Sequence, residues 1–434
     1  MNKKVKFLSL IPIIYFSVSG GPYGLEEIVS SVGPLLTLVL ILVLPVVWTI
    51  PEAMIVAELS SNFPVQGGYY KWVQFGLGNF WGFMEGWWSI LYTIIDLSLY
   101  PILFGTYLKF LFPHINFNSL YFIQLLMIWT CVVINFIGIK SVSNVLAFIK
   151  MFILISFLFF ILLTLSHVSF DIRPLFVAQK QIYVNDFLFG LSLAFWNFIG
   201  WDNPSSVLGE IEKAEKIYHK ALFCTIPIVV LFYFLPVLSG SLVHTNWSDW
   251  KFGEFSYIAK SISHPLLATL LAVGGMLSCL GLFNSLLLSS TRVFSVMSED
   301  GYFPKILSLI HPRFKTPYVC IFVLGIVYSF LILLDFRNLV IYDVFLYLIA
   351  MSLEAIALYC LRKKEKCSNH AFKIPFGSYG LWTVLILVII NVSFIVLVNF
   401  LELIHSFQSM LFALFLIFSG VPIYFFCKFL KPKC

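Results

Sequence analysis

Charged side chains are scarce in this chain. Asp, Glu, Lys and Arg make up 11% of its 434 residues, whereas a soluble domain carries roughly 25%. Hydrophobic residues reach 60%, so the composition excludes a soluble fold and predicts an all-α integral membrane protein, because helices satisfy their own backbone hydrogen bonds in lipid. The formal net charge of +6 therefore bears on membrane topology and gives no indication of a nucleic-acid partner.

The sequence also lacks clusters of reactive or metal-binding side chains. Its cysteines are scattered without metal-ligand spacing and are expected to be reduced; the eight are Cys131, Cys224, Cys279, Cys320, Cys360, Cys367, Cys427 and Cys434. No nucleophile is paired with a base, and the eight histidines fall mostly near loops and span ends. These gaps argue against an enzyme, a metal site and a bound cofactor.

Apolar segments long enough to cross a bilayer, about 20 residues each, recur twelve times. We place them near 7–32, 34–59, 80–110, 118–138, 143–166, 187–209, 221–243, 265–297, 317–334, 339–361, 379–402 and 407–429.

Basic residues then predict the orientation. With the N-terminus in the cytoplasm, twenty Lys and Arg lie on the inner side and six on the outer side, and Lys150, inside a span, completes the 27. The positive-inside rule favours this topology. We therefore expect a multi-pass protein of the cytoplasmic (inner) or plasma membrane, with both termini in the cytoplasm.

The first apolar segment contains a break at Gly20-Gly21-Pro22. Glycine weakens a helix, and proline lacks a backbone N–H but suits the first position of a new one. We predict that a half-helix restarts at Pro22 and presents free N–H groups, from Tyr23 and Gly24 onward, to an anionic group. Unwound backbone at membrane depth belongs to a cavity or to buried protein. The alternative is a proline kink with two acids at the outer mouth.

A second break lies in the sixth span, where Phe195–Pro204 combines a glycine, polar residues and a proline. Breaks in spans one and six imply repeats of five spans, and an odd number inverts the second repeat. The repeats would cover about 1–170 and 185–366 of a single transmembrane domain (1–434), with two extra helices over about 379–430. Interrupted helices at matching positions of inverted repeats predict a transport site near the midplane.

Acidic residues inside spans are few, and ionisable groups at membrane depth are usually functional. Glu26 and Glu27 follow the first break and would attract a cation, Glu52 lies in the second span, and Asp96 and Asp202 lie at mid-depth. A cavity lined by several of these acids would favour a positively charged substrate.

For other ionisable residues the sequence leaves both a functional and a structural role open. Glu58 and Glu85, near span ends, are expected to reach water or a backbone donor. For Glu354 the sequence favours neither role. Lys150 lies about eight residues into the fifth span. It could carry a proton through a transport cycle, or it could extend to the cytoplasmic surface.

Several motifs resemble those of the amino acid–polyamine–organocation superfamily. They are the unwound segment 19–24, the runs 58–59, 63–64, 67–69 and 209–212, and above all Ser289–Lys305 followed by His311–Pro317. The segments 20–27, 50–53, 81–83, 95–101 and 195–202 look like those of plant-type polyamine uptake transporters, which are related to L-type amino-acid transporters. A family proline is replaced near Ala214–Lys216, in a loop.

The resemblance implies the leucine-transporter-like fold, alternating access and proton coupling. It also implies that Lys150 matches the lysine that replaces a sodium site in some members, and that Trp196 lies over the substrate. Some superfamily exchangers bind an accessory subunit through an outer-loop cysteine. Because the loop between spans three and four has none, an accessory subunit is not expected.

We therefore expect a secondary active transporter for amino acids or polyamines. The alternatives are a substrate exchanger (antiporter) for neutral or cationic amino acids and a membrane nutrient sensor that does not transport. The predicted substrate-binding residues are Ser19, Gly20, Gly21, Pro22, Tyr23, Gly24, Glu26, Glu27, Glu52, Asp96, Phe195, Trp196, Asn197, Gly200, Trp201 and Asp202. Rings of Tyr23, Trp196 and Trp201 would close over the substrate, and Lys150 is the predicted proton-coupling residue.

Overall fold

The computed structural model describes residues 4–167, 172–176, 181–262, 264–332, 336–364, 372–403 and 407–430. Over these residues the chain is helical, apart from turns and one isolated bridge between Val5 and Ile211. Nine of the described helices are long and apolar enough to cross a membrane, and three more are apolar but shorter. The predicted all-α membrane architecture is confirmed.

The first half of the chain contains five spans and one short extra helix. Its elements are α1 (Phe7–Val18), α2 (Glu26–Val32), α3 (Pro34–Leu44), η1 (Pro45–Thr49), α4 (Ile50–Asn62), α5 (Gly68–Leu77), α6 (Asn79–Leu111), α7 (Phe117–Ile137) and α8 (Ile139–His167). α1 and α2 form the first span, and α3, η1 and α4 form the second.

The second half repeats this order of spans and adds two. Its elements are η2 (Arg173–Phe176), α9 (Val184–Trp196), η3 (Asn203–Glu210), α10 (Ala214–Val243), η4 (Trp247–Asp249), α11 (Glu254–Ser261), α12 (Pro265–Glu299), η5 (Lys305–Ser308), α13 (Tyr318–Leu331), α14 (Phe336–Lys363), α15 (Gly377–Leu403) and α16 (Phe407–Leu430). α9 and η3 form the sixth span. The exact repeat boundaries, 1–170 and 185–366, stay a prediction.

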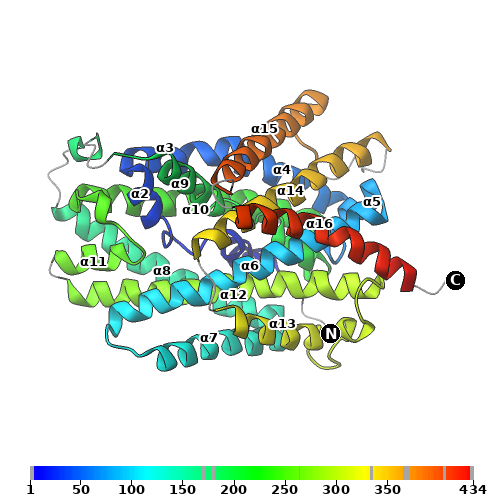
Figure 1. Cartoon of the computed structure of the whole chain (residues 1–434), viewed down its shortest axis with the longest axis horizontal. Coiled ribbons are helices and arrows are strands. Elements are labelled where there is room, and N and C mark those ends of the chain that lie inside the picture. Colours follow the sequence, from blue (N-terminus) through cyan, green and yellow to red (C-terminus); the bar gives the residue numbers. More distant parts are fainter. Residues whose placement is uncertain are drawn as a thin grey trace.

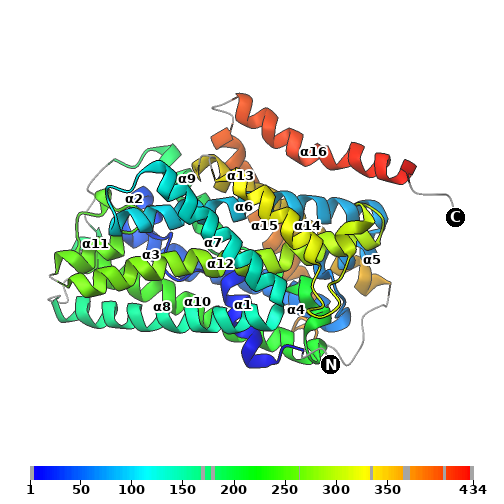
Figure 2. The same cartoon turned by 90° about the horizontal axis from the view of Figure 1, so that it is seen from below.

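The long helices run roughly along the horizontal direction of Figure 1, with α11 at the left end of the molecule and α5 at the right end. We call these ends the α11 face and the α5 face. Figure 2 shows α16 along the outer edge and α1 and α2 as two separate segments. α6 and α12 pack most extensively against each other. They flank the interrupted helices.

The first break falls where the glycines predict it, but the helix does not restart at Pro22. Residues 19–25 are non-helical, with Gly21 and Gly24 at φ of +93° and +100°, and α2 begins at Glu26. The Pro22 carbonyl accepts a bond from the Leu25 N–H at 3.2 Å. Because Gly24 turns the chain into the left-handed region, the helix can begin only after it.

The second break is confirmed in the sixth span. α9 ends at Trp196, and Gly200 lies at φ +98° before a 3-10 segment begins at Asn203. The predicted span 187–209 is therefore two short helical pieces separated by unwound chain.

Paired residues close the α5 face. Val5 donates to the Glu210 carbonyl and accepts from the Glu212 N–H, both at 3.0 Å. Arg292, 1% exposed, donates through Nε to Glu210 at 2.9 Å. The N-terminal segment, the end of the sixth span and α12 are thereby joined.

Candidate functional site

The two breaks touch each other in the middle of the bundle. A Cβ built on Gly200 would lie 2.5 Å from the Ser17 carbonyl oxygen, so only glycine permits this approach. Ser17 in turn shares a hydrogen bond of 2.8 Å with Ser285, and Ser278 donates to the Gly20 carbonyl at 2.6 Å. α12 thus holds the first break against the second.

Two small cavities flank this contact. The aromatic cavity is lined by Val18, Gly20, Tyr23, Tyr100, Leu103, Tyr107, Trp196, Asn197, Ser278, Cys279 and Leu282. The acidic cavity is lined by Ser17, Val18, Tyr92, Asp96, Tyr100, Trp196, Ile199, Gly200, Asn203, Asp343 and Tyr347.

The cavities share the walls made by Val18, Tyr100 and Trp196. The Tyr100 and Trp196 rings are stacked, 6.3 Å apart with 22° between their planes. Each cavity holds about 20 Å³, room for about one water molecule. A substrate would therefore require this aromatic pair to move.

The acidic cavity presents two carboxylates, one from the half-buried Asp96 and one from the buried Asp343. Asp96 accepts hydrogen bonds from the Tyr100 hydroxyl at 2.8 Å and from the Trp196 indole at 3.1 Å. Asp343, 1% exposed, has one oxygen without a hydrogen-bond partner. No Lys or Arg of the described residues lines either cavity. A positive charge on a ligand would compensate these acids.

Four further buried acids, here called the carboxylate cluster, lie beyond the cavity wall: Glu52, Glu85, Asp202 and Glu354. The Tyr347 hydroxyl, which lines the acidic cavity, contacts Asp202 at 2.6 Å and also contacts Glu52. Glu85 and Glu354 lie close enough to Asp202 to interact with it electrostatically. Tyr347 therefore stands between the acidic cavity and the carboxylate cluster.

The structure brings six of the predicted substrate-binding residues to the cavities: Gly20, Tyr23, Asp96, Trp196, Asn197 and Gly200. The others lie outside them. Ser19, Gly21, Pro22 and Gly24 form the backbone of the first break, and Glu52 and Asp202 belong to the carboxylate cluster. Phe195 packs on Trp48 at 5.9 Å, and the Trp201 indole donates to the Phe198 carbonyl at 3.0 Å.

The Glu26 side chain is hydrogen-bonded to the Gly24 backbone N–H, which the sequence analysis predicted to bind an anionic ligand group. Its carboxylate accepts from the Gly24 N–H at 2.7 Å and from the Gly253 N–H, beside α11, at 3.3 Å. Glu26 is fully buried and ties the first break to the α11 face. Its neighbour Glu27 is only half-buried and lines neither cavity.

Lys150 lies half-buried on α8, on the side toward Cys224 of α10, and lines neither cavity. Ile153, one turn later, is the α8 residue nearest Gly21, 3.0 Å from the position of a Cβ there. The proton-coupling role of Lys150 stays a prediction.

Asp343 and Tyr347 are the residues that the sequence reasoning missed. Both come from the middle of α14, a continuous helix with no glycine or proline to draw attention to it. The rule that buried acids in spans are functional would have found Asp343 if applied to span 339–361.

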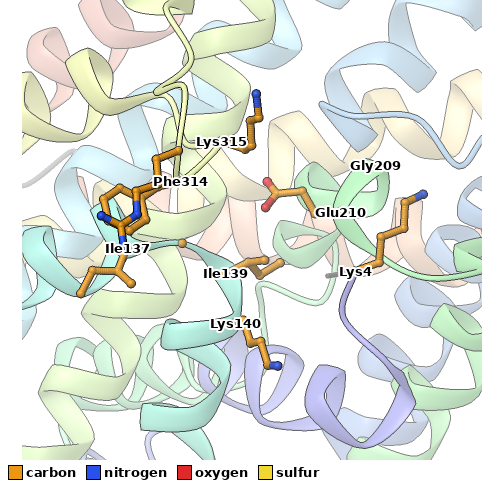
Figure 3. A pocket seen from close by; sticks show the side chains of 10 residues that line it. Lys4, Ile137, Ile139, Lys140, Gly209, Glu210, Phe314 and Lys315 are labelled. Atoms are coloured by element: carbon orange, nitrogen blue, oxygen red, sulfur yellow. The ribbon is translucent and has the colours of Figure 1, made fainter. Parts of the chain in front are cut away.

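A larger hollow of about 290 Å³ lies at the α5 face, away from both breaks. Figure 3 shows side chains from the N-terminal segment, the start of α8 and the end of η3 around it, with Lys4 and Lys140 directed away from Glu210. Glu210 is already paired with Arg292. The hollow shares no residue with the two cavities.

Comparisons with known proteins agree with this architecture. The crystal structure of MhsT in complex with L-phenylalanine superimposes with a TM-score of 0.69 at 12% identity, covering 90% of this chain and 98% of that one. The chain is 34% identical to the polyamine transporter RMV1 of Arabidopsis thaliana over 87% of its length and 77% of the relative's. It is 33% identical to the polyamine transporter PUT1 of Oryza sativa subsp. japonica, covering 87% and 71%.

A bacterial relative is more distant. The serine/threonine exchanger SteT of Bacillus subtilis (strain 168) is 25% identical over 88% of this chain and 86% of its own. The model of the family described as "Amino acid permease" matches residues 6–421. This chain, a membrane transporter rather than an enzyme, therefore belongs to the amino acid permease family.

Proposed function

We propose that this transporter carries polyamines, together with protons, across the cytoplasmic membrane. The observation that carries the proposal is the acidic cavity, where the half-buried Asp96 and the buried Asp343 have no basic partner among the described residues that line it. Burying charge without compensation is costly, and an ammonium group of the substrate would supply the compensation.

The neighbouring cavity suits the rest of such a molecule. Polyamines alternate ammonium groups with methylene chains, and the aromatic cavity offers Tyr23, Tyr107 and Trp196 beside the acids. Aromatic faces attract cations by about 0.5–2 kcal/mol each. The names of the plant relatives, both polyamine transporters, point the same way.

An amino acid is the second candidate, because the family model is one of amino acid permeases and SteT is a serine/threonine exchanger. Its carboxylate would need backbone N–H groups in the first break. The Gly24 N–H is already bonded to Glu26, which weakens this candidate without removing it.

The excess of Lys and Arg supports the placement of the α5 face in the cytoplasm. Twenty basic residues fall in segments that the twelve-span topology assigns to that side and six to the other. Both termini would then be cytoplasmic. We make no proposal of an accessory subunit.

The test is uptake of labelled spermidine and labelled leucine into proteoliposomes, each with and without an inward proton gradient. Gradient-driven spermidine uptake is expected. Asp96→Asn and Asp343→Asn should each lower the apparent affinity about 10-fold or more, because each removes a charged partner worth about 1.5–3 kcal/mol. The control is Asp249→Asn, an exposed acid outside both cavities. Leucine uptake without spermidine uptake would contradict the proposal and favour the amino acid.

A further inference from the structure

The Tyr347 hydroxyl has too few hydrogens for its contacts. It lies within hydrogen-bonding distance of both Asp202 and Glu52, yet a hydroxyl carries a single hydrogen. An ionised carboxylate only accepts hydrogen bonds. One of the two contacts therefore needs a hydrogen that resides on a carboxylate.

Asp202 and Glu354 form a second pair of neighbouring acids. Their carboxylates lie close enough to interact electrostatically, without a hydrogen bond between them. Glu354 is fully buried, and neither of its oxygens has a donor. Two carboxylates in one site share a proton in preference to ionising together. Glu52 and Glu85 add one more buried oxygen each without a partner.

The surroundings offer no cation to replace these protons. The titratable side chains that face the carboxylate cluster from other positions are phenols from four helices: Tyr69 of α5, Tyr92 of α6, Tyr218 of α10 and Tyr347 of α14. Arg292 is the one fully buried Lys or Arg of the described residues, and it is paired with Glu210. The four acids line neither of the two cavities, so a cation that neutralises them must be small, and a proton is the smallest.

We propose that the carboxylate cluster is the proton site of this transporter, with the Asp202–Glu354 pair holding the coupled proton and Tyr347 as the positioning residue that links it to the substrate. This proposal rests on the proposed function for the identity of the substrate. The argument that the carboxylate cluster is protonated does not depend on which substrate is carried. The acidic cavity is neutralised by an ammonium group and the carboxylate cluster by a proton. Loading both sites allows the two charges to cross together, which is symport.

The test separates proton coupling from substrate translocation. Counterflow, the exchange of labelled for unlabelled spermidine at equal pH, requires substrate sites and conformational change but no proton gradient. Uphill accumulation under an inward gradient requires the proton as well. We expect Glu354→Gln to keep counterflow within about threefold of wild type, because glutamine has nearly the shape of a protonated glutamate and is likewise uncharged, and to lose at least tenfold in accumulation.

Asp343→Asn is the matched variant, since it removes a buried acid from the same helix on the substrate side. It should raise the half-saturating spermidine concentration in counterflow while the gradient still increases uptake. Asp202→Asn, which changes the other member of the pair and lies outside both cavities, should behave like Glu354→Gln. Agreement between the two variants guards against misfolding of a single one.

Accumulation that survives in both Glu354→Gln and Asp202→Asn would overturn the proposal. Loss of counterflow in variants that spermidine still stabilises against heat would also overturn it, because these residues would then serve the conformational change itself. If wild type exchanges leucine and not spermidine, the substrate assignment fails. The same comparison is then run with leucine, and the proton site is judged separately.

Discussion

Gly200→Ala tests whether the contact between the two breaks holds the site together. Gly200 lies at φ +98°, a conformation that costs an L-residue about 1–2 kcal/mol. The new methyl group would also lie 2.5 Å from the Ser17 carbonyl oxygen. That oxygen is backbone and cannot rotate away, so the overlap adds about 1–3 kcal/mol. The total cost to the stability of the folded protein is about 2–5 kcal/mol. Only a separation of the two breaks would relieve the overlap.

Gly78→Ala is the matched control. Gly78 has nearly the same φ, +94°, but nothing lies within 4 Å of the position of its Cβ, so it incurs only the backbone strain of about 1–2 kcal/mol. Thermal unfolding followed by fluorescence should place Gly200→Ala a few degrees below Gly78→Ala. Spermidine counterflow by the Gly200→Ala variant should fall at least tenfold, because small misplacements of binding groups are costly. Equal stability and equal counterflow in the two variants would refute the reasoning.

Three further results are expected. Glu58 is fully buried and accepts a hydrogen bond from the Arg362 Nε at 2.5 Å. Glu58→Gln should therefore lower the free energy of unfolding by about 3 kcal/mol, because the guanidinium loses its charged partner. An unchanged melting temperature would show that water replaces the carboxylate. Tyr23→Phe removes the 2.7 Å hydrogen bond to the Leu271 carbonyl, which should cost about 1 kcal/mol in the same melting assay. Burial raises the pKa of Glu254, between the spans, from its ordinary 4.5 to about 7. The contribution of Glu254 to stability is therefore largest below pH 4.5 and is lost as the pH rises to about 7. Glu254→Gln should flatten the pH profile of the melting temperature in that window.

The positions of both breaks could be predicted because glycine and proline act locally. Their details could not. Pro22 suits the start of a helix, yet α2 begins only at Glu26 because Gly24 adopts a positive φ and its N–H is bonded to the Glu26 side chain. Such a bond depends on the fold of a turn and is not visible in residue types alone.

The acids show the same limit. The sequence identified Glu52, Asp96 and Asp202 as functional acids inside the spans; Glu52 and Asp202 are buried, and Asp96 is half-buried. It did not separate them into two groups, because that depends on which face of α4, α6 and the second break each occupies. Tyr347, which links the groups, gives no signal in sequence, since tyrosines are common in spans. Trp201 was expected over the substrate, but it points toward the Phe198 carbonyl.

The bridge between Val5 and Ile211 has a consequence for how the protein is made. Val5 is synthesised more than two hundred residues before its partners at 210–212. At about 5–20 residues per second, the amino-terminal segment waits on the order of 10–40 s for them. The α5 face therefore cannot be sealed while the first five spans are being inserted, and its closure marks the arrival of the sixth.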